Sequence, residues 1–516
     1  MKKLTREEIA AILAEPNGPV KLVQMNIDLD SLFDNAAAMF KEEGAASALL
    51  IRLAAKKQYL IRISEDETIK EAARAALSSP AAKLRRNAAR LLGAVKDEAS
   101  ESAIIAALDK EDQRFVRPSL ILALGSIGSE KAAGYLKDYR VAPPADDTEQ
   151  KHFNEETEAL VTALRSFAPR TAHEFTGLKS AWTTELRAAD MLSRQLAEEL
   201  SDLGLESFDE RRSSLKVTTA DYPGLFEARC FSEVLFPIGS CEAIPSAIAK
   251  KAAPFIEKLM REAHTGEPPY RFRTENALSL PESVSRAELT RAVSAAVENA
   301  SLVNAPSDYE VELRMEGSMK TARLYAKLTT FPDTRFSYRE GSIPASMAPN
   351  VAASVLRFAS EHLSVNARVI DPCCGSGTFL IERGLMSPCA SLTGVDIAHK
   401  AIDIARRNTE LAGVNAKYTV NDILRFECHR PYDELISNLP FGNRVGDHSS
   451  CERLYSGLLA KLPQLVKKGG VAILYTMEFT LLKRLIREHS GRLTLLSQAR
   501  TEAGGLTPMI FILRVN

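Results

Sequence analysis

The stretch "ARVIDPCCGSGTFLIERGL", residues 367–385, decides the fold of the last third of the chain. A short apolar run ends at Asp371, a loop with Gly375 and Gly377 follows, and a helix is expected from Thr378 onward. Two glycines let the backbone turn tightly and approach a ligand before a helix begins. The loop is not a phosphate-binding loop, because no Lys-Ser/Thr follows the glycines, and it is not a G-x-G-x-x-G fingerprint. The stretch therefore predicts a strand, a ligand-binding loop and a helix.

The same order of strand, loop and helix recurs over residues 335–516. It is repeated in "SLTGVDIAHKAIDIARRN" (391–408), "KYTVNDILRF" (417–426), "YDELISNLPFG" (432–442) and "GGVAILYTM" (469–477). This alternation predicts a doubly wound, mostly parallel α/β sheet. The last apolar runs, in "LTLLSQARTEAGGLTPMIFILRVN" (493–516), predict an antiparallel hairpin at the edge of that sheet.

Polar side chains stand where the first four of these strands end. Ligands of doubly wound sheets bind at the carboxyl ends of the strands, so these side chains are expected to share one crevice. After the glycine loop, Asp396 suits two hydrogen bonds to ribose hydroxyls, and Asp422 suits an exocyclic adenine amine. The fourth strand ends at Asn438, within "SNLPFG". Each acid alone could cap a helix or begin a turn, but the ordered series predicts a ligand site.

These motifs carry a resemblance to a known family. "DPCCGSGTFLIE" (371–382) followed by "SNLPFG" (437–442) resembles the RNA methylase family of class I S-adenosylmethionine-dependent methyltransferases. The chain is similar in particular to the THUMP-containing N2-guanine methyltransferases of tRNA and ribosomal RNA. The segment "FSYREGSIPASMAPNVAASVLRFA" (336–359) resembles the family's lead-in to the catalytic domain. For residues 335–516 the resemblance implies a Rossmann-like methyltransferase fold.

The resemblance also assigns site residues. It implies that S-adenosyl-L-methionine is held by Asp371, Cys373, Gly375, Gly377, Thr378, Asp396, Ile397, Asn421 and Asp422. The catalytic N/D-P-P-Y/F stretch of the family would be Asn438, Leu439, Pro440 and Phe441, and Leu439 departs from the commoner proline.

The segment after the catalytic stretch, residues 441–455, is expected to be a mobile loop over the target base. Arg444 would contact phosphate or base there, and a solvated surface arginine is the alternative. His448 and Cys451 lack further ligands at useful spacing, so no metal site is expected.

Residues 1–170 are expected to form an α-solenoid of HEAT-like repeats. A shift of 32 residues superimposes "LRRNAARLLGAV" (84–95) on "VRPSLILALGSI" (116–127), with a weaker copy in "EALVTALRSFA" (158–168). The shift places Arg85 on Arg117 and Gly93 on Gly125. Such a period is typical of stacked helical pairs, and an alanine-rich helical bundle is the alternative. Repeats of this kind usually bind proteins, so the alignment points to a protein partner for this region.

Residues 171–334 predict an α+β module. The run "TTELRAADMLSRQLAEELSDLGL" (183–205) is expected to be helical. Short β-type runs follow: "SLKVTT" (214–219), "LFEARCF" (225–231), "YRFRTE" (270–275), "YEVELRME" (309–316) and "ARLYAKLTT" (322–330). The resemblance implies ferredoxin-like and THUMP-like RNA-binding parts here.

Bulk composition limits the class of protein. The 516 residues are too many for one core, and 66 Lys and Arg nearly cancel 67 Asp and Glu, so no global basic field indicates nucleic-acid binding. No leader or membrane-spanning stretch is expected. The seven cysteines show no disulfide spacing, which favours a cytoplasmic protein.

Three hypotheses of function follow. The first is methylation of guanine N2 in tRNA or ribosomal RNA. The second is methylation of another amine, in DNA adenine or protein glutamine. The third is a catalytically inactive scaffold.

Overall fold

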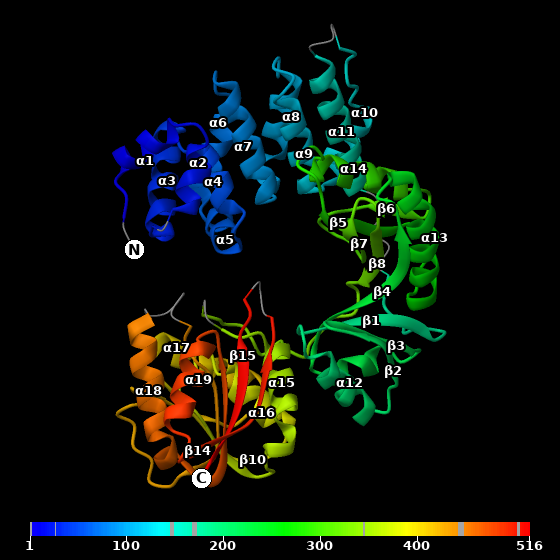
Figure 1. The fold of residues 1–516 in the computed structure, drawn as a ribbon. Helices are drawn as coiled ribbons and strands as arrows, with labels where there is room; N and C mark the ends of the chain where they lie inside the picture. Colours follow the sequence, from blue (N-terminus) through cyan, green and yellow to red (C-terminus); the bar gives the residue numbers. More distant parts are fainter. Residues whose placement is uncertain are drawn as a thin grey trace. The chain divides into compact units, whose positions relative to one another are not determined.

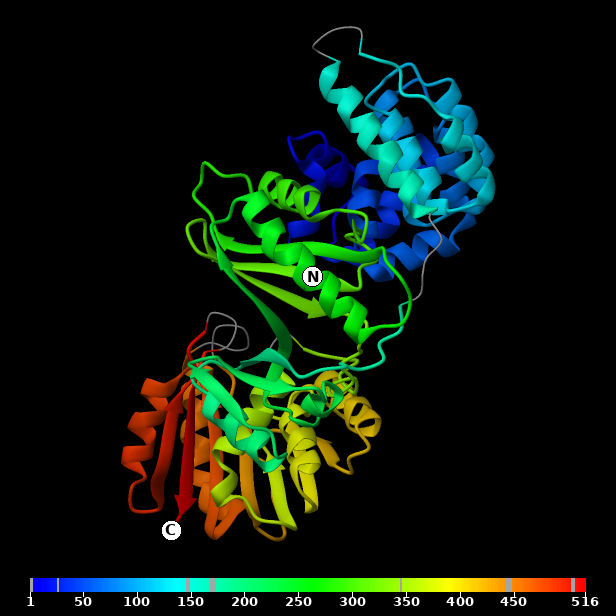
Figure 2. The same ribbon diagram turned by 90° about the vertical axis from the view of Figure 1, so that its right-hand side faces the viewer.

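The computed structural model describes residues 3–25, 27–144, 149–167, 173–343, 346–441, 448–502 and 506–516. The chain forms two compact units, Met1–Arg170 and Thr171–Asn516 (Figures 1 and 2). In these described ranges no helix has the length and apolar character that crossing a membrane requires. The seven cysteines all lie in described residues and are free thiols.

The first unit is built from paired helices. Its described helices are α1 (Arg6–Leu13), α2 (Gly18–Gln24), α3 (Leu29–Glu43), α4 (Ser47–Ala54), α5 (Lys57–Glu65), α6 (Glu67–Ala76), α7 (Ala82–Ala94), η1 (Glu98–Ser100), α8 (Glu101–Asp109), α9 (Arg117–Ile127), α10 (Glu130–Asp138) and α11 (Gln150–Ser166). Helices α4, α7, α9 and α11 pack in series, each against the next (Figure 1). One continuous hydrophobic core runs through the unit, as expected for stacked helical pairs.

The repeat is visible in the contacts of its arginines. Arg85 Nη1 donates to the carbonyl of Ser79 at 2.8 Å, and Arg117 Nη2 donates to the carbonyl of Glu111 at 2.8 Å. Each guanidinium also meets a buried carboxylate further along the chain. Arg85 lies 2.6 Å from Glu111, and Arg117 lies 3.7 Å from Glu156. The equivalence of Arg85 and Arg117 is therefore confirmed.

The paired glycines mark the closest approach between successive helices. A Cβ atom on Gly93 of α7 would lie 2.9 Å from Ala123 Cα of α9. A Cβ atom on Gly125 of α9 would lie 2.7 Å from Ala163 Cα of α11. These distances leave no room for a side chain, so both glycines are required by helix packing.

The second unit begins with a mixed sheet. Over its described residues the strands are β1 (Trp182–Ala188), β2 (Ser207–Arg211), β3 (Ser214–Thr219), β4 (Phe231–Cys241), β5 (Tyr270–Ser279), β6 (Leu302–Asn304), β7 (Val311–Ser318) and β8 (Ala322–Leu328), in the order β2-β3-β1-β4-β8-β7-β5-β6. The first half of β4 pairs with β1 and the second half pairs with β8. Helices α12 (Ser193–Asp202), α13 (Pro245–Ala263) and α14 (Arg286–Val297) accompany this sheet. The α+β character is confirmed.

Two expectations in this region are wrong. The run from Thr183 begins as strand β1, because β-branched threonines suit a pleated surface and Thr183 Oγ1 lies 2.8 Å from Thr218 Oγ1 of β3. The run at 225–231 is not a strand, because Pro223 starts a 3-10 turn, η2 (Pro223–Glu227), and β4 begins only at Phe231.

A doubly wound sheet follows. In the part that the structure describes it has the order β11-β10-β9-β12-β13-β15-β14. The strands are β9 (Ala367–Asp371), β10 (Cys389–Asp396), β11 (Lys417–Val420), β12 (Tyr432–Asn438), β13 (Val466–Thr476), β14 (Leu493–Arg500) and β15 (Met509–Val515). Strands β9 to β13 are parallel, and β15 runs antiparallel to β13 and β14. The expected parallel sheet with a terminal antiparallel hairpin is confirmed.

Helices cover both faces of this sheet (Figure 1). One face packs against α15 (Pro349–Phe358), α16 (Thr378–Met386) and α17 (His399–Leu411). The other face packs against α18 (His448–Leu465) and α19 (Phe479–Glu488). The strand order reverses between β9 and β12, which is the place where ligands of such sheets bind.

A buried carboxylate joins the two sheets of the second unit. Glu382 of α16 is 1% exposed and accepts hydrogen bonds from Arg229 Nε at 2.7 Å and from Tyr338 Oη at 2.6 Å. Arg335 Nη1 donates to the carbonyl of Ala228 at 2.8 Å. The mixed sheet is therefore anchored to the helix that follows the glycine loop.

We predict that Gly125→Ala destabilises the helical unit by about 1–3 kcal/mol, because the added methyl group overpacks the contact between α9 and α11. Hydrogen exchange of these helices and thermal unfolding of the full chain measure the effect. The control is Gly134→Ala in α10, where a Cβ meets no atom within 4 Å. This change should stabilise its helix by up to about 1 kcal/mol. Equal stability of the two variants would contradict the packing role of Gly125.

Candidate active site

Four parallel strands deliver their last residues to one edge of the sheet. β9 ends at Asp371, β10 at Asp396, β11 at Val420 and β12 at Asn438. The sheet order places these strands side by side, with β9 between β10 and β12. The sequence-predicted residues of the four strand ends are therefore brought together.

Asp371 is the buried centre of this edge. Its side chain is 2% exposed, and Oδ1 accepts hydrogen bonds from Ser437 Oγ at 2.7 Å and from the Cys373 amide at 3.1 Å. Burial raises the pKa of Asp371 to about 7, and the nearby Asp396 carboxylate adds to the rise. The two hydrogen bonds favour the ionised form and act against burial. Asp371 thus joins the glycine loop to the end of β12.

The glycine loop takes a conformation that needs glycine. Gly375 and Gly377 have φ values of 51° and 80°, in the left-handed region. A Cβ on Gly377 would also lie 2.6 Å from Tyr418 Oη. The loop then leads directly into α16 at Thr378. The loop is therefore shaped by backbone geometry and close packing together.

Asp396 holds the glycine loop and keeps capacity for a ligand. Its Oδ2 accepts from the Gly375 amide at 2.9 Å, and its Oδ1 accepts from the Ala398 amide at 2.9 Å. An ionised carboxylate has about four lone-pair sites, so each oxygen can accept one further hydrogen bond. The adjacent Ile397 is 73% exposed, which places an apolar side chain beside the acid.

The end of β11 is tied to Asp396 through the backbone. The Asn421 amide donates to the Asp396 carbonyl at 3.0 Å. Asp422 Oδ1 accepts from the Leu424 amide at 2.9 Å, and its carbonyl accepts from the Arg425 amide at 2.9 Å. Asp422 therefore begins a turn, and its half-exposed carboxylate stays at the strand edge.

Leu439 makes a contact that the commoner proline could not make. Its amide donates to the Tyr475 carbonyl of β13 at 2.9 Å, and its side chain is 1% exposed. A proline has no N–H to donate. The departure from the family pattern thus extends the pairing of β12 with β13 by one hydrogen bond, directly after Asn438.

Pro440 and Phe441 are held by two tyrosines. The Pro440 carbonyl accepts from Tyr455 Oη of α18 at 2.7 Å, and Tyr455 Oη lies 2.6 Å from Thr476 Oγ1. Phe441 is half-buried, and its ring centre lies 6.3 Å from that of Tyr475. The turn after Asn438 is therefore fixed from α18 and β13. Arg444 and residues 442–447 lie outside the described residues. The expectation of a loop is wrong for residues 448–455, because they form the first two turns of α18.

The sequence did not indicate the contacts that fasten the lead-in segment to the glycine loop. Ser346 Oγ lies 2.8 Å from Ser376 Oγ and accepts from the Ile343 amide at 2.9 Å. Asn408 Nδ2 donates to the carbonyls of Gly341 at 3.0 Å and Ser376 at 3.2 Å. The sequence offered one signal, the resemblance of residues 336–359 to the family's lead-in segment. That resemblance does not say which residues the segment contacts.

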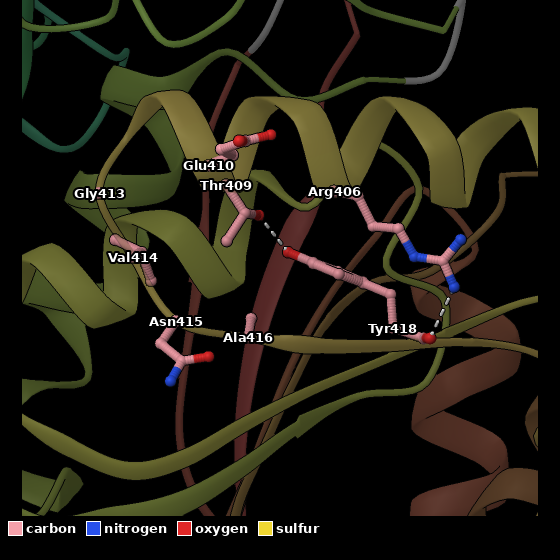
Figure 3. A pocket seen from close by; sticks show the side chains of 8 residues that line it. All are labelled: Arg406, Thr409, Glu410, Gly413, Val414, Asn415, Ala416 and Tyr418. Atoms are coloured by element: carbon pink, nitrogen blue, oxygen red, sulfur yellow. Dashed lines mark hydrogen bonds between the residues drawn. The ribbon is translucent and has the colours of Figure 1, made fainter.

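An open hollow of about 370 Å³ lies elsewhere on the domain (Figure 3). It is lined by Arg406, Thr409, Glu410, Gly413, Val414, Asn415, Ala416 and Tyr418. Tyr418 Oη lies 2.7 Å from Thr409 Oγ1, and a dashed line in Figure 3 marks this hydrogen bond. The loop at 413–416 precedes β11, at the end opposite to Asp422. The hollow is therefore distinct from the strand-end site. Among the described residues, no three His, Cys, Asp or Glu side chains cluster as a metal site.

Comparisons with known families match two parts of the chain. Residues 337–503 match the family described as "RMKL-like, methyltransferase domain". Residues 69–151 match the family described as "HEAT repeats". The helical repeats and the methyltransferase fold that the sequence indicates are thus confirmed at this level.

Comparisons with individual proteins point the same way. The chain is 27% identical over 311 residues to the tRNA (guanine(6)-N2)-methyltransferase of Thermus thermophilus, covering 58% of this chain and 85% of that protein. It is 26% identical over 149 residues to the tRNA (guanine(10)-N2)-dimethyltransferase of Methanothermobacter thermautotrophicus, covering 28% of this chain and 43% of that protein. The crystal structure of TrmN from Thermus thermophilus superimposes with a TM-score of 0.51 at 22% identity, covering 65% of this chain and 99% of that one. The superposition shows a shared fold.

We predict that the ligand-free protein loses stability as Asp371 ionises. The folded pKa of about 7 lies above the ordinary 3.8, so the fold favours the protonated carboxyl. The contribution of protonated Asp371 to the free energy of unfolding is fully present below about pH 4 and is lost as pH rises through 7. Relative to Asp371→Asn, the free energy of unfolding should fall by up to about 4 kcal/mol between pH 4 and pH 8. Urea unfolding across this range measures the difference.

Ser437→Ala provides the second variant for this measurement. It removes a hydrogen bond that favours the ionised carboxylate, so the pKa of Asp371 should rise further. The loss of stability on ionisation should then occur at higher pH. A difference between wild type and Asp371→Asn that does not change with pH would show that Asp371 keeps an ordinary pKa.

We predict opposite effects of the same substitution at the two tyrosines. Tyr455→Phe removes the hydroxyl donor of the Pro440 carbonyl, leaves it the weaker Cys451 thiol at 3.4 Å, and should cost about 1–3 kcal/mol. Tyr475 Oη is buried and has no hydrogen-bond partner in the described part of the chain, so Tyr475→Phe should be neutral or stabilising. Equilibrium unfolding of both variants tests this. An equal loss of stability would refute the assigned contact to Pro440.

Proposed function

We propose, from the premise that residues 337–503 are an RMKL-like methyltransferase domain, that the chain methylates the N2 amine of a guanine in tRNA or ribosomal RNA. The observation that carries the proposal is the arrangement at the strand ends. Two acids, the glycine loop and the Asn438–Phe441 stretch lie side by side along one edge of the sheet, at the ends of β11, β10, β9 and β12.

The strand-end residues fit S-adenosyl-L-methionine as the cofactor. Asp396 can accept from two ribose hydroxyls with the lone pairs that its amide contacts leave. Asp422 can accept from the adenine amine, and exposed Ile397 can cover the ring. The left-handed glycine backbone allows close approach of the loop. The loop and strand-end residues Asp371, Cys373, Gly375, Gly377, Thr378 and Asn421 complete the proposed cofactor set.

The proposed chemistry requires acceptors for an aromatic amine. S-adenosyl-L-methionine supplies an electrophilic methyl sulfonium. An exocyclic amine is a poor nucleophile because its lone pair is delocalised into the ring. The side-chain oxygen of Asn438 and the carbonyl of Leu439 can accept from this amine and increase its electron density. The Pro440 carbonyl already accepts from Tyr455, so that contact fixes the turn.

The position of the target base follows from the same turn. We assign to Phe441 the role of stacking on the target base, and a paired base would first have to be flipped out of its helix. Alignment of the amine with the methyl group would supply much of the rate.

RNA is favoured over DNA or protein by the names of the relatives. Two of them are named as tRNA guanine-N2 methyltransferases. We assign residues 171–334 to a ferredoxin-like and THUMP-like RNA-binding module, which the Arg229–Glu382 contact anchors to α16. A module fixed in this way can position a folded RNA by its backbone. We place the protein in the cytoplasm, with residues 1–170 as a HEAT-like region open to a further partner.

We predict that Asn438→Ala lowers methyl transfer from labelled S-adenosyl-L-methionine to tRNA or ribosomal RNA by about 100-fold or more. Cofactor binding measured by calorimetry should persist in this variant. Asp396→Ala should instead weaken cofactor binding by about 100-fold, because two charge-assisted hydrogen bonds are lost. Asp403→Asn, an exposed acid of α17, is the control and should behave as wild type.

The substrate is tested in the same assay. Transfer to DNA or to a protein, with none to RNA, would replace the proposed substrate by another amine. Absence of cofactor binding in the wild-type protein would leave the scaffold hypothesis in its place.

A further inference from the structure

The helical unit carries three arginines that the repeat does not use. Arg52 lies on α4, and Arg86 and Arg90 lie on α7. Arg52 and Arg90 are exposed, and Arg86 is half-buried. Within the described residues none of the three forms an ion pair or a hydrogen bond, whereas their neighbour Arg85 is paired with Glu111 at 2.6 Å. We call these three residues the arginine patch.

The patch is held together by the packing of its two helices. Asn87 Nδ2 of α7 donates to Ser47 Oγ of α4 at 3.1 Å, and the two helices pack side by side (Figure 1). Arg86 and Arg90 are one helical turn apart, about 6 Å along the axis. Partial burial, followed by the charges of Arg86 and Arg52, lowers the pKa of Arg90. The three guanidinium groups are therefore close enough to repel one another.

Comparison of the two repeats shows that the patch is not a structural feature of the repeat. The 32-residue shift places Arg85 on Arg117, and both make the same backbone contact. The same shift places Arg90 on Leu122, which is 41% exposed. It places Arg86 on Pro118. Folding of a repeat thus requires the first arginine and does not require the other two.

Several other arginines of the unit are paired with carboxylates of the unit. Arg62 lies 2.5 Å from Asp34, Arg74 lies 2.6 Å from Asp97, and Arg114 lies 3.0 Å from Glu156. Like charges grouped without a counter-charge raise the energy of the free protein, and an anionic partner removes that cost. The arginine patch is therefore expected to bind a ligand with several closely spaced negative charges.

We propose that the arginine patch binds the phosphate backbone of the same RNA that the methyltransferase domain modifies. The inference rests on the proposed function for its ligand. Guanidinium groups bind phosphates in bidentate fashion, and backbone contacts of this kind position an RNA without reading its sequence. The chain has a net charge of −1, so its affinity for RNA depends on local groups of cations. The helical unit is thus a second RNA-binding surface.

The test compares full-length wild-type protein with the triple variant R52E/R86E/R90E. Binding to total tRNA is measured by fluorescence anisotropy over a range of salt concentrations. Loss of three phosphate contacts should weaken binding at least tenfold and reduce the slope of log K against log salt by about 2–3. Substitution of the same three arginines by glutamine should have the same direction of effect. Thermal unfolding verifies that the variants remain folded.

The matched control is K96E/K110E/K137E, which reverses three exposed lysines of the same unit. Within the described residues these lysines also lack ion pairs, and they lie outside α4 and α7, with Lys96 two residues beyond the end of α7. The control should keep the wild-type salt slope. Unchanged tRNA binding by the arginine variants would overturn the proposal. If they instead lost binding to polyglutamate alone, the patch would belong to an acidic protein partner, which also overturns it.

Methyl transfer in the same samples separates this inference from the proposed function. If the wild-type protein methylates RNA and the arginine variants bind RNA as wild type does, only the proposed role of the arginine patch is contradicted. Patch-dependent RNA binding without any methyl transfer to RNA would support the patch and contradict the proposed function.

Discussion

The hydrogen bond between Ser437 and Asp371 is the contact on which the site depends. It is 2.7 Å long and joins the end of strand β12 to the buried acid at the start of the glycine loop. The same carboxylate accepts from the Cys373 amide, so one side chain sets the loop and the strand end together. Because Asp371 is buried, displacement of either partner would leave an uncompensated polar group. The glycine loop and the Asn438–Phe441 stretch are thus held in place by the same side chain.

The order of the site could be predicted from the sequence, but its supports could not. Parallel strands meet at one edge, so Asp371, Asp396 and Asn438 could be grouped from the βα alternation alone. The contact of Leu439 with Tyr475 depends on a strand almost forty residues away, and Ser346 meets Ser376 across a loop. Periodicity carries no information on such pairs. The departure at Leu439 gains its meaning only from the structure, where it supplies an amide hydrogen bond.

The fold shows the same division between local and long-range information. The repeat of Arg85 and Gly93 as Arg117 and Gly125 could be recognised in the sequence because α7 and α9 pack through the same contacts. The segment that begins at Thr183 was expected to be helical, but its pairing with β3 makes it a strand. The pairing of β4 could not be predicted either. Its first half pairs with β1, which precedes it in sequence, and its second half pairs with β8, which follows it.

The most direct measurement of the central claim is nucleoside mass spectrometry of RNA from cells that lack this chain. Guanine-N2 methylation by the Asn438 stretch predicts that N2-methylated guanosine disappears from one tRNA or ribosomal RNA position. Wild-type protein should restore it, and Asn438→Ala should not. Unchanged N2-methylguanosine together with loss of a different modified nucleoside would contradict the claim, as would full restoration by Asn438→Ala.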